Sequence, residues 1–537
     1  MRRQNESNVV WCIAAIGLFV VFSLCCFNEG LVYVGDNIFL HNRLVQIRDC
    51  LSHGLWPFLY YEDVGGIGYG SPIFYGQLSL FPFLPLAGQI SSFLRVYYLC
   101  CLLLNFFAFR CFLKRVSSYA TLTSCLYIFS MAFLGLFNGN IPANAMAVGF
   151  SWLFFAYCID FFRDGNSFGL VILTYFAIWQ SNFNSVVLAT AVCFGIFFVY
   201  FCVDRICSYA RLLVCVLLVV GFDIYNILSH LDAIALVDPS VLLSIMDVEA
   251  DCRMTSVHPL GGILFRTAIR GVDGCVGFLS FGAFAVFVYY VTRYIRYESL
   301  RFRVCSVVIG VCALVGYIVG CCAIWPDIYE ATNVFFQFPI RYYVLLFGFV
   351  LAILSRVIRS SWFVYFVIIL SIFDVFIVNP FRAGEKDDVR LIGVQLGNGE
   401  YASNEFLKNY DVYDTYGTSV QSSSGAVYSF EREYGSIEVD CSTNRGGDVI
   451  TLPKLYYNWY RADGSDGEVF HVSSGYSNYC QVSLGSYIGV LRLTYSPPVL
   501  AYVLLGLQAC SIFLLFSRLL VDCLSWRRRD HACSEGA

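Results

Sequence analysis

Long apolar runs alternate with short polar connections along most of this chain. A helix needs about 20 mostly apolar residues to cross a membrane. The pattern therefore predicts about twelve spanning helices, at 9–27, 97–113, 119–137, 143–162, 168–183, 185–203, 211–228, 275–292, 304–323, 342–355, 361–378 and 497–516. The region 379–495 breaks this pattern, because it is rich in Tyr, Ser, Gly and Asp and alternates in strand fashion between turn signals. We expect it to form a small β-rich domain between two spans.

The proline-bearing stretch at 73–92 is apolar as well, and the distribution of Lys and Arg decides whether it crosses. If it stays on one side and the N-terminus is cytoplasmic, nearly every short basic cluster, including Lys114-Arg115, faces the cytoplasm. If it crosses, the same clusters face outward. We therefore predict that 73–92 is a juxtamembrane or re-entrant element on the outer face, with both termini cytoplasmic and the first run a retained signal anchor.

This topology predicts a multi-pass protein of the plasma (inner) membrane. The predicted parts are a transmembrane domain at 1–378 with an outer loop at 28–96, an extracytoplasmic β-rich domain at 379–495, a last spanning helix at 496–517 and a basic cytoplasmic tail at 518–537. The outer loop gathers most of the ionisable residues of the first hundred positions. Because charges are costly inside a bilayer, a cluster at its boundary is a candidate functional site.

Composition supports the membrane assignment and excludes other classes. The chain of 537 residues is 58% hydrophobic and 13% charged, whereas soluble domains carry about 25% charged residues. A net charge of −4 gives no reason to expect nucleic acid as a partner. Most of the 24 cysteines lie in apolar runs and none has zinc-site spacing. Two lie in the β-rich region, Cys441 and Cys480, and the sequence leaves open whether they pair or stay free.

Four local patterns carry a resemblance to a known family. Gly35-Asp36 with Phe39 and Arg43 resembles a GD…FH..R start. The other three patterns are GGIGYGSPIFYGQLSLFPFLPL at 65–86, FQFPIRYY at 336–343 and LPKLYYNWYRADGSDGEV at 452–469. Together with the span pattern they resemble the GT-C glycosyltransferase superfamily, and within it the YfhO-like, 6-pyruvoyl-tetrahydropterin synthase-related integral membrane proteins. The resemblance covers almost the whole chain, although each motif is short.

The sequence departs from the family pattern at two positions. The family histidine directly follows the phenylalanine, whereas here Leu40 intervenes and His41 is displaced by one residue. One residue is about 100° of rotation on a helix, which puts the family role of His41 in doubt. In NGNIPANAMA, where relatives often carry an acid, Asn144 stands instead. A mechanism that needs a second carboxylate from that turn is therefore in doubt too.

The resemblance implies transfer of a sugar from a polyprenyl-phosphate donor, which requires a base and a cation. Asp36, at the outer boundary of the membrane, is the candidate base that deprotonates the acceptor hydroxyl. It is equally well explained as the cap of a helix that begins at Asn37. Arg341, at the start of a late span, is the candidate phosphate ligand. Its alternative is an interfacial arginine whose head reaches the headgroups.

The remaining candidate substrate-binding residues have weaker warrants. Arg43 lies two helical turns after Asp36, so an ion pair between them is an alternative to substrate contact. The others are His41, Glu62, Asp63, Tyr69 and Gln337, the last two within the resembling motifs. For the acids, exposed loop positions are the commoner explanation. No protein metal cluster is expected, and a divalent cation is left open as a cofactor.

The sequence thus favours a GT-C-like membrane glycosyltransferase with two kinds of partner besides membrane lipid. The resemblance implies a polyprenyl-phosphate-linked sugar as donor and an envelope glycopolymer or glycolipid as acceptor on the outer face. The alternative is a non-catalytic GT-C-like scaffold or lipid carrier of envelope assembly, which the displaced His41 and Asn144 favour. A transporter is disfavoured, because the chain shows neither repeats nor paired interrupted helices.

Overall fold

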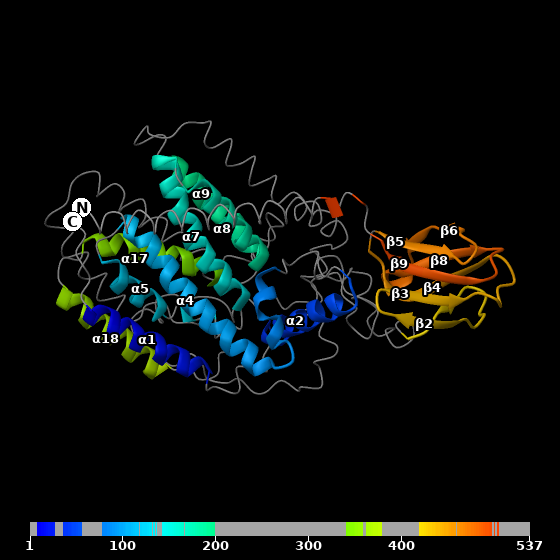
Figure 1. Cartoon of the computed structure of the whole chain (residues 1–537), viewed down its shortest axis with the longest axis horizontal. Coiled ribbons are helices and arrows are strands. Elements are labelled where there is room, and N and C mark those ends of the chain that lie inside the picture. Colours follow the sequence, from blue (N-terminus) through cyan, green and yellow to red (C-terminus); the bar gives the residue numbers. More distant parts are fainter. Residues whose placement is uncertain are drawn as a thin grey trace, which may run out of the picture. The chain divides into compact units, whose positions relative to one another are not determined.

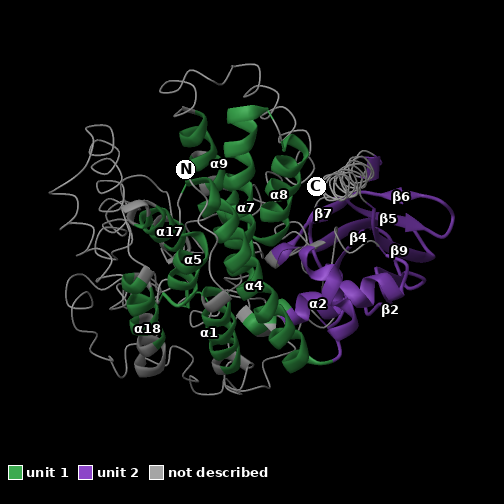
Figure 2. Ribbon diagram, turned by 60° about the vertical axis from the view of Figure 1, so that its left-hand side comes forward, with its two compact units in different colours: residues 1–40, 89–219, 247–387 green, residues 41–88, 220–246, 388–537 purple. Residues whose placement is uncertain are grey.

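The computed structural model describes residues 8–26, 36–55, 78–116, 119–130, 133–134, 136, 142–165, 167–198, 340–357, 361–378, 418–457, 459–496, 499 and 502–503. The chain divides into two compact units, which Figure 2 colours separately. Unit 1 comprises residues 1–40, 89–219 and 247–387, and unit 2 comprises 41–88, 220–246 and 388–537. The boundary falls inside helix α2 (Asp36–Ser52), so its first residues belong to unit 1 and the rest to unit 2.

Unit 1 is helical. Besides the start of α2, its described helices are α1 (Asn8–Cys26), α4 (Ile90–Val116), α5 (Ala120–Ile128), α7 (Pro142–Asp164), α8 (Phe168–Ser181), α9 (Phe183–Phe198), α17 (Ile340–Val357) and α18 (Ser361–Val378). Helix α7 packs against α4, α8, α9 and α17, while α5 packs against α1, α4, α17 and α18 (Figure 1). Two of the described helices, Ile90–Val116 and Ala143–Asp164, are long and apolar enough to cross a membrane. Val10–Ser23 and Phe168–Ser181 are apolar but shorter.

An aromatic cluster around Trp152 forms the core of the helical unit. The Trp152 indole is fully buried and donates a hydrogen bond to the Tyr127 hydroxyl at 3.0 Å. The rings of Phe109 on α4 and Phe349 on α17 lie with their centroids 4.7 and 5.0 Å from it. The backbone of α17 approaches the same indole, because a Cβ added at Gly348 would lie only 2.2 Å from Trp152 Cζ2. Glycine is therefore required for α17 to pack this closely.

Side-chain contacts give the directions of the helices. Asn105 bonds to the carbonyl of Ala145 near the start of α7, and Arg115 pairs with Asp160 near its end. The second pair lies further along both helices than the first pair, so α4 and α7 are parallel. The same holds for α7 and α9, where the Cys158 and Cys193 sulfurs lie 3.7 Å apart and contacts occur at both ends of the pair. Helix α8 packs against both and runs antiparallel to α7, because Phe168 near its start contacts Phe161 near the end of α7.

Helix α1 runs opposite to α4. Trp11, near the start of α1, lies under the guanidinium of Arg110 near the end of α4, at 4.4 Å from ring centroid to Cζ. Further along α1, a Cβ added at Gly17 would meet the Phe129 ring, just beyond α5. Helix α1 thus begins beside the end of α4 and packs along it, and Figure 1 draws the two helices antiparallel. The end of α1 and the beginning of α4 consequently lie at the same end of the bundle.

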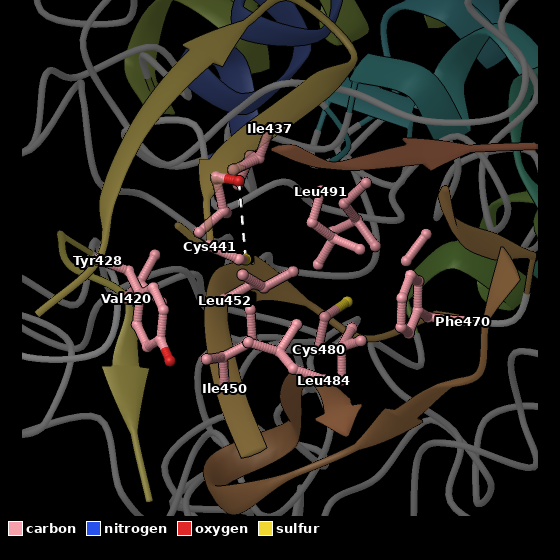
Figure 3. Packing of buried hydrophobic residues seen from close by; sticks show 14 of the residues in the cluster. Val420, Tyr428, Ile437, Cys441, Ile450, Leu452, Phe470, Cys480, Leu484 and Leu491 are labelled. Carbon is pink, nitrogen blue, oxygen red and sulfur yellow. Dashed lines mark hydrogen bonds between the residues drawn. The ribbon is translucent and has the colours of Figure 1, made fainter. Parts of the chain in front are cut away.

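Unit 2 contains a β-sandwich of two antiparallel sheets. Its strands are β1 (Gln421–Ser422), β2 (Ser429–Glu433), β3 (Ser436–Asp440), β4 (Asp448–Leu455), β5 (Tyr460–Gly464), β6 (Val469–Phe470), β7 (Val472–Ser474), β8 (Tyr479–Gly485) and β9 (Val490–Tyr495). The sheet orders are β1-β4-β8-β7 and β2-β3-β9-β5-β6. Inward side chains from both sheets, among them Ile437, Leu491, Ile450 and Leu484, form one core (Figure 3). The expectation of a β-rich region is thus confirmed for 421–495.

The two cysteines of the sandwich are separate thiols in this core (Figure 3). Cys441 and Cys480 are both fully buried, and each thiol donates to a nearby carbonyl, of Val439 and Leu455 respectively. Burial, with the charges of nearby acids, raises the pKa of Cys441 to about 11. Burial also raises the pKa of Cys480. The thiols therefore pack as small apolar groups, which answers the question that their spacing left open.

Several predicted spans correspond to described helices, with different bounds. The predicted 361–378 is α18, and 9–27 and 143–162 match α1 and α7 within two residues at each end. Helix α4 begins at Ile90 rather than 97, and α5 ends at Ile128, well short of the predicted 137. The predicted spans at 211–228, 275–292 and 304–323 lie outside the described residues.

The proline-bearing stretch forms a short 3₁₀ helix, η2 (Leu78–Leu86), which contains Pro82 and Pro85. Proline lacks the N–H that an α-helix would use, which explains the irregular form. Nine residues of 3₁₀ helix extend about 18 Å, whereas the apolar layer of a bilayer is about 30 Å thick. The described part of this stretch is therefore too short to cross a bilayer as a helix.

Candidate functional site

The start of α2 is held in place by a buried hydrogen bond. The helix begins at Asp36, one residue earlier than the capping interpretation required. The next residue, Asn37, is fully buried, and its Oδ1 accepts a hydrogen bond of 2.7 Å from the Tyr98 hydroxyl. Tyr98 lies on α4, one of the two helices able to cross a membrane. The backbone that carries the candidate base is thus fixed to a rigid element.

A second polar residue lies on the same face of α4. Asn105 follows Tyr98 by seven residues, which is two turns and about 10 Å along the helix. Its Nδ2 donates to the carbonyls of Ala145, at 2.7 Å, and Cys101, at 2.9 Å. Two carbonyl acceptors fix the orientation of the amide, so Oδ1 faces away from them. This Oδ1 is buried and has no hydrogen-bond partner within the described part of the chain.

Asn144 connects the beginnings of α7 and α9. It is fully buried, and its Oδ1 accepts a hydrogen bond of 2.9 Å from Ser185 Oγ. Asn182, between α8 and α9, in turn caps the backbone N–H of Ser185 at 3.2 Å. The contact joins the first turns of α7 and α9, through two residues 41 positions apart in the sequence. The Asn144 Nδ2 is buried and unpartnered among the described residues, like the Asn105 Oδ1.

These six residues form two groups about 10 Å apart along α4, Asn37 with Tyr98 and Asn105 with the residues around Asn144. Together they are called here the amide cluster and are treated as the candidate site. Its members are Asn37, Tyr98, Asn105, Asn144, Asn182 and Ser185. All six side chains are neutral, so the cluster can position a hydroxyl or water but supplies neither base nor cation. An unpaired buried amide atom costs about 1–3 kcal/mol, which a bound hydroxyl or water would recover. The acid at this site would have to come from Asp36, next to Asn37.

The other predicted residues of α2 are constrained by packing. His41 is half-buried and its Nε2 lies 3.0 Å from the carbonyl of Ala87, just after η2. Burial lowers the pKa of His41, with a smaller lowering from the positive charge of Arg48, against the opposing effect of the Ala87 hydrogen bond. A neutral imidazole donating to Ala87 acts as a strut between α2 and η2. Arg43 is 3% exposed and lies on the buried face of the helix.

The structure places the remaining predicted residues only in part. Arg341 is the second residue of α17, so the predicted position at the beginning of a late apolar helix agrees with the structure. Glu62, Asp63, Tyr69 and Gln337 lie outside the described residues. No group of three or more His, Cys, Asp or Glu side chains gathers as metal ligands within the ranges that the structure describes.

Sequence reasoning did not single out Asp448, whose carboxylate is the most heavily bonded in the sandwich. Its Oδ2 accepts from the hydroxyls of Ser422, Ser424 and Tyr428 at 2.6–2.8 Å. Its Oδ1 accepts from Ser423 Oγ at 2.7 Å and from two backbone N–H groups. Burial alone would raise its pKa, but these hydrogen bonds outweigh that effect and hold the pKa well below its usual range. An acid with every lone pair occupied is structural, and the run SSSG was its only signal in the sequence.

The C-terminal end of α2 contacts the β2–β3 hairpin within unit 2. The imidazole of His53 stacks on the Tyr434 ring with centroids 4.2 Å apart and planes 2° apart. The Tyr434 hydroxyl lies 3.3 Å from Cys50 Sγ. A Cβ added at Gly435, which has φ +84°, would meet Leu55 at 2.9 Å. The hairpin therefore fits closely against the last turn of α2.

Comparisons with known proteins add no relative. No family model matches the chain, and neither a curated protein nor a solved structure matches it.

Proposed function

We propose that this protein is a GT-C-like membrane glycosyltransferase. It would transfer a sugar from a polyprenyl-phosphate donor to an envelope glycopolymer or glycolipid on the outer face of the membrane. The proposal includes about twelve spanning helices, cytoplasmic termini and an extracytoplasmic sandwich that guides the acceptor. The described part of the chain supports the coarser statement, with two helices able to span a membrane and small antiparallel sheets.

The observation that carries the proposal is the anchoring of Asp36. The hydrogen bond from Tyr98 to Asn37 fixes the start of α2 to a membrane-capable helix, and Asp36 is the adjacent residue. A base must be held within hydrogen-bond reach of its proton, and a rigid helix start provides such a position. In the reaction, Asp36 would take the proton of the acceptor hydroxyl as the oxygen bonds to the sugar carbon. The polyprenyl phosphate would leave with the electron pair of the broken bond, and Arg341 would neutralise it.

The amide cluster supports a hydroxyl-rich ligand. It has a buried acceptor on Asn105 and a buried donor on Asn144, neither with a partner among the described residues. Hydroxyl groups can satisfy both, because each donates one hydrogen bond and accepts two. A sugar or its acceptor presents several such groups, which fits the proposed substrate class.

Donor consumption by the full-length protein in proteoliposomes tests the role of Asp36. We expect Asp36→Asn to reduce consumption of polyprenyl-phosphate sugar by about 10²–10⁴-fold, the usual contribution of a general base. Asp36→Glu should retain part of the activity. The matched control is Asp49→Asn on the same helix, because Asp49 pairs with Arg48 at the surface. Equal activity of Asp36→Asn and wild type would rule out the base assignment.

Arg341 is tested by the dependence on donor concentration. If its guanidinium binds the leaving phosphate, Arg341→Ala should raise KM for the donor and lower kcat, and Arg341→Lys should restore part of both. A purely interfacial arginine would leave both constants unchanged.

A non-catalytic scaffold or lipid carrier is the second candidate. The observation that favours it is Asn144, which is buried and bonded to Ser185 at a position where the family that the sequence resembles often has an acid. A scaffold would bind the polyprenyl-phosphate sugar without consuming it. Binding of radiolabelled donor by the wild type, with no release or transfer of the sugar, would favour this candidate over the enzyme.

A further inference from the structure

Exposed apolar side chains gather at one end of the β-sandwich. Val427, Val469, Ile488 and Val490 are 86%, 58%, 66% and 41% exposed. Among the described sandwich residues the only other large apolar side chain with comparable exposure is Tyr476. Single exposed apolar residues need no explanation, whereas several at one end of a domain make that end a candidate interaction surface.

Strand register shows that these four residues share an end. Val490 begins β9, and its cross-strand partner is Asp440 at the end of β3, which in turn pairs with Ser429 just after Val427. On the other side of β9, Ser465 bonds to the Val490 carbonyl, and β6 begins at Val469. Val427, Val490 and Val469 thus lie just before or at the beginning of β2, β9 and β6, every second strand of this sheet, and Ile488 lies two residues before Val490. At about 4.8 Å per strand, they span roughly 20 Å.

This end, called here the distal end, lies opposite to the end that continues into the last apolar segment. Ser496, which follows β9, bonds to Trp459, and the β2–β3 hairpin with Tyr434 lies at the same end as Ser496. Helix α2 contacts that hairpin through His53. Among the described residues, the contact between the sandwich and α2 is therefore made at the end opposite to the distal end.

The loops of the distal end are fixed by buried polar residues. Asp448 holds the β1–β2 loop through the serine hydroxyls described above. Asn444 Nδ2 donates to the carbonyls of Tyr487 at 2.7 Å and Gly485 at 3.1 Å, which joins the β3–β4 loop to the β8–β9 loop. The Tyr487 hydroxyl accepts from the Ser465 N–H at 2.8 Å and donates to the Val490 carbonyl at 2.7 Å. A surface ordered before binding loses little entropy on association.

The charges at the distal end decide among the partners. Asp440, Asp466 and Glu468 are exposed there, and the exposed cations at this end, among the described residues, are Arg445 in the β3–β4 loop and Arg492 on β9. Arg492 lies within 3.5 Å of the carboxylates of Glu433 and Glu438, so acids remain in excess at this end. An anionic lipid surface would be repelled, and a second copy would bring the same acids together. A protein with an apolar patch bordered by Lys or Arg would complement both the apolar residues and the acids. We propose that the distal end is a docking surface for such a protein.

The test uses the full-length protein in nanodiscs of neutral lipid. The probes are a labelled peptide of alternating Lys and Leu and its Glu-Leu counterpart, with fluorescence anisotropy as the measurement. We expect the Lys-Leu peptide to bind at least tenfold tighter than the Glu-Leu peptide. Ile488→Ser and Val469→Ser should each weaken binding about tenfold, because a buried aliphatic side chain contributes about that factor. Tyr476→Ser, at the opposite end, is the matched control.

Three results would overturn the proposal. Equal affinity of the Ile488→Ser and Tyr476→Ser variants would mean that the peptide binds elsewhere. Flotation with phosphatidylglycerol vesicles that is lost in Ile488→Ser would assign the surface to lipid. Self-association in sedimentation that Ile488→Ser abolishes would assign it to a second copy. All the substituted residues are exposed, so we expect each variant to remain folded. Thermal melting of each variant checks this.

Discussion

Replacing Asp448 should destabilise the sandwich selectively. The carboxylate is 4% exposed and accepts six hydrogen bonds, four of them from side-chain hydroxyls. Asp448→Ala leaves the buried Tyr428 hydroxyl without its acceptor and removes the shared acceptor of the three partly or fully exposed serines. This should cost about 2–4 kcal/mol, below the roughly 3–5 kcal/mol for a fully buried charged network, because water can reach the serine hydroxyls. Asp448→Asn keeps one acceptor oxygen and should cost about 1.5–3 kcal/mol. A domain of this size is stable by about 4–12 kcal/mol.

The buried thiols provide an assay within the full-length protein. Cys441 and Cys480 are fully buried in the folded sandwich, so maleimide labelling of their peptides, quantified by mass spectrometry, reports unfolding of this region alone. In urea at pH 7, Asp448→Asn should lower the labelling midpoint by about 1–2 M. The control is Asp463→Asn, because Asp463 pairs with Arg461 at the surface and exposed pairs contribute about 0–1 kcal/mol.

The pH dependence gives a second, independent readout. Because the pKa of Asp448 is lower in the folded than in the unfolded state, its contribution to the free energy of unfolding is complete above the unfolded value near 4. It is lost as the pH falls from there toward the folded value. The wild-type midpoint should therefore decrease below about pH 4, and Asp448→Asn should show a shallower decrease. Equal midpoints for Asp448→Asn and Asp463→Asn, or parallel pH profiles, would refute the structural role of the carboxylate.

Two further predictions concern packing in the two units. Gly348→Ala should lower the melting temperature of the detergent-solubilised protein, because the new methyl would lie 2.2 Å from Trp152. The free energy of unfolding should fall by about 1–3 kcal/mol. Gly195→Ala is the control and should be neutral, because the space around Gly195 is open. Equal melting of the two variants would contradict the close approach of α17. Tyr434→Ala removes the ring beside Cys50, so maleimide should label Cys50 faster than in the wild type. An unchanged labelling rate would mean that the β2–β3 hairpin does not shield the end of α2.

Apolar runs predicted helices well where nothing interrupts the run. The predicted bounds of α18 agree with the structure, because 361–378 is apolar except at Ser361, Ser371 and Asp374. The predicted span begins seven residues after the start of α4, because Ser91, Ser92 and Arg95 interrupt the apolar run at the beginning of that helix. In the sandwich, VLRLTY is β9, but the run VITLPKLYYNWYRA is divided into β4 and β5. The division lies at Trp459, whose φ of +88° breaks the extended backbone.

The candidate site was predictable only where its chemistry is local. The acid Asp36 stands out because it follows an apolar run, and its place at the start of a helix needed only the neighbouring sequence. The contacts of Asn144 with Ser185 and of Asp448 with Ser422 join residues 41 and 26 positions apart. Such pairs form only when the intervening segments pack. No local pattern reveals them, and a neutral Asn looks like a lost acid until its partner is known.

The helix directions bear on the side of the membrane at which Asp36 lies. Because α1 and α4 are antiparallel, the end of α1 and the beginning of α4 lie at the same end of the bundle. If both helices span the membrane, the segment between them must therefore cross the membrane an even number of times or not at all. The described elements between α1 and α4 are consistent with no crossing, because α2 carries charged residues along its length and η2 is too short to cross. This supports an outer-face position for α2 and η2 if the N-terminus is cytoplasmic. The outer-face position can be tested with a cysteine at exposed Ser52, in a variant in which Cys50 is replaced by Ser. We expect a membrane-impermeant maleimide to label this cysteine from outside intact cells. Labelling only after permeabilisation would place the loop inside and exclude a base at Asp36 for outer-face transfer.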